Sequence, residues 1–206
     1  MRSTCSFVGF RITVPEAESA PEARLAFTVR PLAPGDHKTV FNFAGLDSDD
    51  ASMLDARLRL LRSGLGTAYV GETADGGLCY LGWTIAGSTE LDETRTFFGE
   101  TFAVLAPTEA LVEGSWVPPR YRGYGVMAPA MRKMLDVSLP AGLDTAITFV
   151  EDINIASSKG VMRAGFVPFT IRTDTWRNFR CTATWREISA NDYDPWSDHV
   201  SAATVA

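Results

Sequence analysis

Apolar and polar residues alternate in short runs along much of the chain, and this pattern predicts strands in several places. A two-residue period puts successive side chains on opposite faces of a sheet, so such runs indicate half-buried strands. Alternating or apolar runs of strand length occupy residues 5–14, 25–32, 67–72, 78–86, 96–105, 110–117, 145–150, 166–176 and 180–188. The run at 96–105 is interpreted as an edge strand with a bulge at Gly99.

Helical spacing of apolar residues predicts helices elsewhere. The helical segments lie at residues 37–43, 53–61, 126–135 and 155–165. We expect Asp36 to cap the first helix and Asp49 or Asp50 to cap the second, and we expect Gly64 and Gly165 to end the second and the last. Because strands and helices interleave without a regular alternation, the order indicates a mixed α/β domain rather than a doubly wound one.

The composition is that of a folded domain without nucleic-acid-binding or membrane-spanning character. The 206 residues are 46% hydrophobic and 21% charged, and the formal net charge is −6 with a pI near 5.0. Since no strongly basic balance and no apolar run of about 20 residues is present, we expect neither a nucleic-acid partner nor a membrane span. The cysteines Cys5, Cys79 and Cys181 lie far apart and outside any metal-ligand motif, so we expect no metal site and a cytoplasmic location.

Three segments follow from where these signals begin and end. Residues 1–24 hold one strand and then a stretch rich in Pro, Glu and Ala, which is typical of a linker, so we assign them to an N-terminal extension. Residues 25–188 are expected to form a single domain. Residues 189–206 are expected to be an acidic, loosely held C-terminal tail.

The segment RYRGYG at residues 120–125 carries the strongest chemical signal, because it joins a predicted strand to a predicted helix. Its glycines let backbone N–H groups approach an anion closely, and the helix N-terminus adds partial positive charge. Arg120 and Arg122 can add charge-assisted contacts. The loop lacks the third glycine of a dinucleotide fingerprint and the Gly-Lys-Ser/Thr of a P-loop, so another phosphate or pyrophosphate ligand is expected. The alternative is an ordinary helix start with solvated arginines.

These residues resemble a known family. Arg120, Gly123 and Gly125 match the R/Q-x-x-G-x-G/A acyl-CoA loop of the GNAT superfamily of N-acyltransferases, preceded by a V-x-P element at residues 117–119. A second motif is also similar: Asn154 is followed by a short helix and then by Gly-Phe at residues 165–166. The opening strand VRPLAPGD, residues 29–36, resembles the family's first strand and turn.

The resemblance implies a central, twisted mixed β-sheet of about seven strands flanked by about four helices, splayed open between its fourth and fifth strands. Those strands would be residues 110–117 and 145–150, with acyl-CoA in the gap. Backbone N–H groups across residues 122–127 would hold the pyrophosphate, and the backbone of Val117 would lie beside the acyl carbonyl. The residues implied in binding acyl-CoA are Val117, Arg120, Arg122, Gly123, Tyr124, Gly125, Val126 and Asn154.

Attack of an amine on a thioester needs a base, and Glu113 is the candidate. It precedes Val117 by four residues, so strand alternation predicts that the two side chains share a face. Diamine acetyltransferases of the superfamily are similar, with a Glu at that offset. A carboxylate of ordinary pKa is a poor base for an alkyl amine, so burial must raise its pKa or water must relay the proton.

The chain departs from the family at the donor of a proton to the leaving thiolate. Many members carry a Tyr seven residues after the motif Asn, and here that position is Val161. Ser157 or Ser158 could take this role, and Ser158 stands as the second catalytic candidate beside Glu113. Water is the remaining alternative.

The resemblance implies an enzyme that transfers acetyl from acetyl-CoA to a primary amine of a small molecule, by direct attack in a ternary complex. Two alternatives stay open: a GNAT-fold protein that binds acyl-CoA without catalysis, and an acyltransferase for longer or carrier-protein-bound acyl groups. Loops at residues 44–52 and 88–108 are expected to shape the acceptor site, where Asp47, Asp49 and Asp50 would suit a cationic amine. The final strands could pair across a homodimer.

Overall fold

A mixed sheet of eight strands runs through the part of the chain that the computed structural model describes, residues 2–14, 22–87, 91–99, 102, 105–138, 143–178 and 180–196. The strands are β1 (Arg2–Thr13), β2 (Phe27–Pro31), β3 (Thr67–Thr73), β4 (Leu78–Ala86), β5 (Glu109–Trp116), β6 (Thr145–Glu151), β7 (Val167–Arg177) and β8 (Arg180–Glu187). The α-helices are α1 (His37–Val40), α2 (Ser48–Ser63), α3 (Leu91–Phe98), α4 (Met127–Ser138) and α5 (Ile155–Arg163). The expected mixed α/β class is confirmed.

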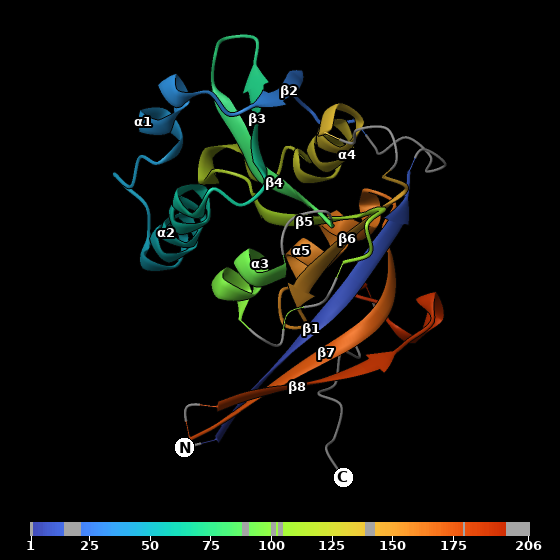
Figure 1. Cartoon of the computed structure of the whole chain (residues 1–206). Helices are drawn as coiled ribbons and strands as arrows, with labels where there is room; N and C mark the ends of the chain where they lie inside the picture. Colours follow the sequence, from blue (N-terminus) through green and yellow to red (C-terminus); the bar gives the residue numbers. More distant parts are fainter. Residues whose placement is uncertain are drawn as a thin grey trace.

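The strand β1 lies inside the sheet, in the order β2-β3-β4-β5-β6-β1-β7-β8. Residues 1–24 were expected to be an N-terminal extension, but β1 pairs antiparallel with β6 on one side and with β7 on the other, so this expectation is wrong for β1. Figure 1 shows β1, in blue, running alongside β7. Its alternation explains this place, because Val8, Phe10 and Ile12 are buried in the core. The larger part of the expected linker, residues 15–21, lies outside the described residues.

The sheet opens between β5 and β6, the one parallel pair among the described strands. The two strands pair over three register positions, residues 109–111 with residues 145–147. Beyond these positions β5 continues to Trp116 and β6 to Glu151, and these parts of the two strands do not pair with each other, so the strands separate. The splay expected between residues 110–117 and 145–150 is therefore present.

Helices cover the two faces of the sheet with separate hydrophobic cores. Met131 of α4 and Val161 of α5 belong to the core that also holds Val112 of β5. Leu54 of α2 belongs to the other core, with the neighbouring β5 residue Leu111. Because Leu111 and Val112 are consecutive strand residues, α2 lies on one face of the sheet and α4 and α5 lie on the other.

Two local predictions are wrong. The predicted edge strand at 96–105 begins instead inside helix α3, which ends at Phe98, and Gly99 follows with a φ of +90° and donates its N–H to the carbonyl of Arg95. Residues 100, 101, 103 and 104 of this run lie outside the described residues. Helix α2 is capped by Asp47 rather than by Asp49 or Asp50, since the Asp47 carboxylate accepts the N–H of Asp50 at 2.8 Å. The predicted end of this helix at Gly64, with a φ of +76°, is confirmed.

The described helices are short, and α2, the longest of them, has 16 residues. None of the helices in these ranges is long and apolar enough to cross a membrane. Within the same part of the chain, no three or more His, Cys, Asp or Glu side chains are grouped so that they could hold a metal ion.

Candidate active site

A bulge in β5 marks the point where the sheet opens. Gly114 and Ser115 of β5 lie at a register shift opposite a single residue of β4, Gly82. Gly114 has a φ of +63°, in the left-handed region that favours glycine. A Cβ atom there would lie 2.9 Å from the ring of Trp83, so packing requires glycine as well. A glycine inside a predicted strand is the sequence signal of such a bulge.

The bulge places Glu113 and Val117 on opposite faces, so the predicted shared face is wrong. An extra residue in the strand shifts the alternation by one position. Leu111 and Trp116 both belong to the core on the α2 side, and alternation then puts Glu113 on the same side. Val117 packs instead against the core on the side of α4.

Arg57 of α2 holds the bulge in shape. Its Nε donates to the carbonyl oxygen of Gly114 at 2.8 Å, and its Nη2 donates to that of Ser115 at 3.0 Å. Its Nη1 donates to the carbonyl of Met53 within α2 at 2.7 Å. The hydroxyl of Ser115 also lies 2.8 Å from the Tyr80 hydroxyl. These contacts satisfy the polar groups that a bulge leaves unpaired in the sheet, and sequence reasoning did not find Arg57 or Tyr80.

The carboxyl group of Glu113 lies in an environment that favours its neutral form. Burial raises the pKa of Glu113 above its ordinary value, while the nearby N–H of Gly114 and the charge of Arg57 act in the opposite direction. The Gly114 N–H donates to Oε1 of Glu113 at 2.9 Å. A raised pKa makes the Glu113 carboxylate a stronger base, and abstraction of a proton from an ammonium group requires such a base.

The raised pKa of Glu113 predicts a pH-dependent cost to stability. Because the folded chain binds this proton more tightly, its contribution is fully present below the ordinary pKa of 4.5 and is lost as the pH rises through the raised folded value. We therefore expect Glu113→Gln to increase the free energy of unfolding near pH 8 and to change it little near pH 4. Urea unfolding at both pH values measures this; a variant less stable than wild type at pH 8 would contradict it.

The glycine loop before α4 leaves open space beside its backbone. Gly123 and Gly125 have φ values of +83° and +72°, and a Cβ on either would meet no atom within 4 Å. Arg122 forms an ion pair with Asp50, a residue that is 3% exposed at the start of α2. Arg122 also donates through Nε to the carbonyl of Val117 at 3.2 Å. Asp50 therefore links the loop to α2, and the hydrogen bond from Arg122 lowers the pKa of Asp50.

Two cavities adjoin at the open part of the sheet. The loop cavity, about 470 Å³, is lined by Arg122, Gly123 and Gly125 among others. The strand cavity, about 300 Å³, is lined by Glu113 and Glu151 among others. Both cavities are lined by Arg57, Ser115, Met127, Asn154 and Ser157. The predicted anion loop and the predicted base therefore face adjoining spaces.

The structure brings most of the predicted cosubstrate residues together. Those that line the loop cavity are Val117, Arg122, Gly123, Gly125, Val126 and Asn154. Arg120 lies elsewhere, with its guanidinium 4.7 Å from the centre of the Tyr121 ring, and it lines a separate hollow. The side chain of Tyr124 is exposed. Asn154 caps α5 by accepting the N–H of Ser157 at 3.1 Å.

The two candidate serines differ in position. Ser158 is fully buried, and its hydroxyl accepts a hydrogen bond from Tyr193 at 3.0 Å. Tyr193 belongs to the predicted tail, and its ring lies edge-on to Phe10 with 5.7 Å between centroids. Ser157, by contrast, lines both cavities. Tyr193 is a neighbour of the site that sequence reasoning missed, because nothing local in an acidic tail indicates where it packs.

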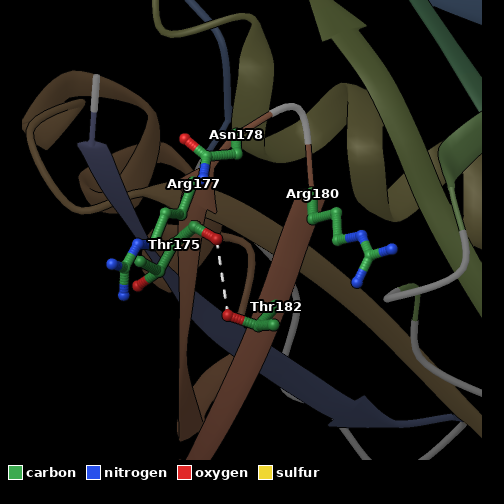
Figure 2. Close-up of a pocket in the computed structure, with 5 residues that line it drawn as sticks. All are labelled: Thr175, Arg177, Asn178, Arg180 and Thr182. Atoms are coloured by element: carbon green, nitrogen blue, oxygen red, sulfur yellow. Dashed lines mark hydrogen bonds between the residues drawn. The ribbon is translucent and has the colours of Figure 1, made fainter.

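Other hollows lie away from these residues. One of about 570 Å³ is formed by the hairpin of β7 and β8. Figure 2 shows its side chains, with Arg177 and Arg180 projecting to opposite sides and the hydroxyl of Thr182 donating to the carbonyl of Thr175 at 3.4 Å. Another, of about 640 Å³, lies between residues 22–27 and α4. Neither is lined by a predicted catalytic or cosubstrate residue.

Solved structures share this architecture, although no protein-family model and no curated protein matches the sequence. A GNAT-family acetyltransferase from Colwellia psychrerythraea matches 85% of this chain and 56% of its own, with a TM-score of 0.52 at 15% identity. A GCN5-related N-acetyltransferase from Sphaerobacter thermophilus matches 90% of this chain and 52% of its own, with a TM-score of 0.52 at 13% identity. A GCN5-related glucosamine N-acetyltransferase region in a fungal multi-domain β-N-acetylglucosaminidase matches 89% of this chain and 21% of its own, with a TM-score of 0.57 at 10% identity.

At these identities the likeness is one of fold, and the chain has the GNAT fold. The chain spans little more than half the length of the Colwellia and Sphaerobacter proteins. The fold implied by the sequence motifs is confirmed, with eight strands among the described residues in place of about seven because β1 enters the sheet.

Proposed function

We propose that this chain is an acyl-CoA-dependent N-acyltransferase that transfers acetyl from acetyl-CoA to a primary amine of a small molecule. One observation carries the proposal: the loop cavity and the strand cavity adjoin at the splay of β5 and β6. The glycine loop, which is suited to a pyrophosphate, lines one of these cavities, and the carboxyl group of Glu113, whose pKa is raised, lines the other. The GNAT fold supports the same activity.

The loop residues would bind the cosubstrate through the backbone. N–H groups across residues 122–127 take the pyrophosphate, because Gly123 and Gly125 leave the backbone accessible to a large anion. The ion pair with Asp50 keeps Arg122 beside this loop. The pantetheine arm then follows the loop cavity toward Asn154 and Ser157, which also line the strand cavity.

Direct transfer requires a neutral amine in contact with the thioester. Glu113 accepts a proton from the ammonium group of the acceptor, whose nitrogen then forms a C–N bond with the thioester carbon. The C–S bond breaks and the nitrogen loses its second proton, which passes through a serine hydroxyl or a water to the departing thiolate. Ser157 is the serine that lines both cavities, whereas Ser158 is covered by Tyr193.

The two serines are expected to respond differently to removal of their hydroxyl groups. Ser157→Ala should lower kcat by about tenfold, because a thiol that ionises near pH 8.5 needs little help to leave. Ser158→Ala should change kcat by less than about threefold. Steady-state rates with acetyl-CoA affinity measured in parallel test both. A loss of about a hundredfold in Ser158→Ala, with affinity intact, would assign the proton donor to Ser158 instead.

The proposed function is tested by thiol release from acetyl-CoA across a panel of primary amines, with calorimetry of CoA binding as a second readout. Amine-dependent thiol release and an acetylated product support it. Binding of CoA without release for any amine would favour the second candidate, an acyl-CoA-binding protein. Val161 favours that candidate, because a buried valine lines the strand cavity where many family members have a tyrosine. If thiol release is faster from longer acyl-CoA or from carrier-bound acyl groups, the transferred group is that longer acyl group and not acetyl.

A further inference from the structure

The strand cavity has an aromatic wall that β1 and β6 build together. Phe7 of β1 and Phe149 of β6 both line it. Phe149 is paired with Gly9, and a Cβ on Gly9 would lie 2.7 Å from the Phe149 ring. The missing side chain at Gly9 therefore lets the Phe149 ring lie close against β1. Phe7 is present in this wall only because β1 enters the sheet beside β6.

A carboxylate stands directly beside this aromatic wall. Glu151 is the register partner of Phe7, and such cross-strand neighbours share a face with Cβ atoms about 5 Å apart. Glu151 is exposed and lines the strand cavity, and its Oε1 accepts a weak hydrogen bond from the Cys5 thiol at 3.6 Å. Its neighbour Phe7 is half-buried. An acceptor in the cavity would therefore meet an aromatic face and a negative charge together.

The charge of the cavity lining favours a cation. Its ionisable side chains are Glu113, Glu151 and Arg57. Arg57 already donates from all three guanidinium nitrogens to backbone carbonyl groups. Arg172, whose guanidinium lies 5.7 Å from the Phe7 ring centre, is paired at 2.7 Å with Asp174, and both side chains are 11% exposed. The nearby arginines are thus matched by other groups. The charge of Glu151 faces the cavity beside the carboxyl group of Glu113, which becomes negative once it has lost its proton.

We propose that the strand cavity binds an arylalkylamine, that is, a primary alkylammonium that carries a flat, apolar group. The amine must have no carboxylate beside it. The flat group packs against Phe7 and Phe149, and the ammonium faces Glu113. Glu151 determines specificity, because its charge attracts a cation and repels a substrate that carries its own carboxylate. This inference rests on the proposed function only in assigning the acceptor to this cavity.

The test measures amine binding directly, so that it does not depend on turnover. Calorimetry on the CoA-saturated full chain compares 2-phenylethylamine, ethylamine and phenylalanine. Wild type should bind 2-phenylethylamine at least about tenfold more tightly than either of the others. Phe7→Ala should remove most of the advantage over ethylamine. Glu151→Lys should weaken 2-phenylethylamine by about tenfold and strengthen phenylalanine, since the variant exchanges repulsion of its carboxylate for attraction.

Matched variants outside the cavity serve as controls. Glu187→Lys reverses an exposed charge on β8, and Phe43→Ala removes an exposed ring; neither residue lines the strand cavity. Both should leave the affinities unchanged. Equal affinities for the three amines, or Glu151→Lys behaving like Glu187→Lys, would overturn the inference even if thiol release occurs. The expected affinities without thiol release would uphold the acceptor class and overturn the proposed function instead.

Discussion

Glu113→Gln is expected to lower kcat for an amine acceptor by about 10²- to 10⁴-fold, the range that a general base contributes. Glutamine keeps the size of the side chain and an oxygen that can accept the Gly114 N–H, which donates to Glu113 at 2.9 Å. It cannot take a proton from the ammonium group. Acetyl-CoA affinity should stay unchanged, because Glu113 lines the strand cavity and not the loop cavity. Rates across a pH series, with calorimetry, measure both effects.

The pH series adds a second criterion for Glu113. In wild type the rate should rise with pH as the carboxyl group, whose pKa burial raises, loses its proton. The rate of the Glu113→Gln variant should not show the increase with pH that comes from loss of this proton. Glu187→Gln, on the exposed edge strand β8, is the matched control and should behave like wild type. A loss of less than about threefold at the pH optimum would reduce Glu113 to a structural residue.

Gly123→Val is expected to weaken CoA binding by at least about tenfold, or 1.4 kcal/mol. Gly123 lines the loop cavity with open space beside its backbone, and branched methyl groups would occupy the space that a pyrophosphate needs. The φ of +83° also strains a valine there, so the backbone N–H groups would shift. Calorimetric titration with CoA gives the change in Kd.

Strain and ligand exclusion are separated by a second glycine. Gly76 has a φ of +80° and open space around its Cβ position, but it lies in the turn between β3 and β4. Gly76→Val should lose comparable stability in thermal unfolding and keep the wild-type Kd. If Gly123→Val stays folded and binds CoA as wild type does, the pyrophosphate does not lie at this loop.

Features set by neighbouring residues could be predicted from the sequence. Alternation predicted most strands, and the glycine loop before α4 predicted where the loop cavity lies. Gly64 was predicted to end α2 because a positive φ at a helix end depends on little beyond the glycine itself. The role of Glu113 as a base stays a prediction: the strand spacing that suggests it requires a face shared with Val117, which the bulge removes, and Glu113 nevertheless lines the strand cavity.

Features set by distant contacts could not be predicted. Arg122 and Asp50 are 72 residues apart, and Arg57 is 57 residues from the bulge that it holds. The bulge also puts Val117 on the face opposite to the predicted one, because one added residue shifts the strand alternation by one position. The N-terminal strand was assigned to an extension because its alternation indicates a strand but not which strands it pairs with.

The position of β1 also bears on how this protein reaches its native state. Ser6 and Thr173 are 167 residues apart in the chain, yet their hydroxyl oxygens lie 3.4 Å from each other. Contacts of such high sequence separation raise the contact order, which slows folding because a long loop must close first. During synthesis β1 has no strand partner until β6 has left the ribosome, and its second side stays unpaired until β7 follows. The aromatic wall of the strand cavity, which needs Phe7 of β1 beside Phe149 of β6, is therefore completed among the last parts of the fold.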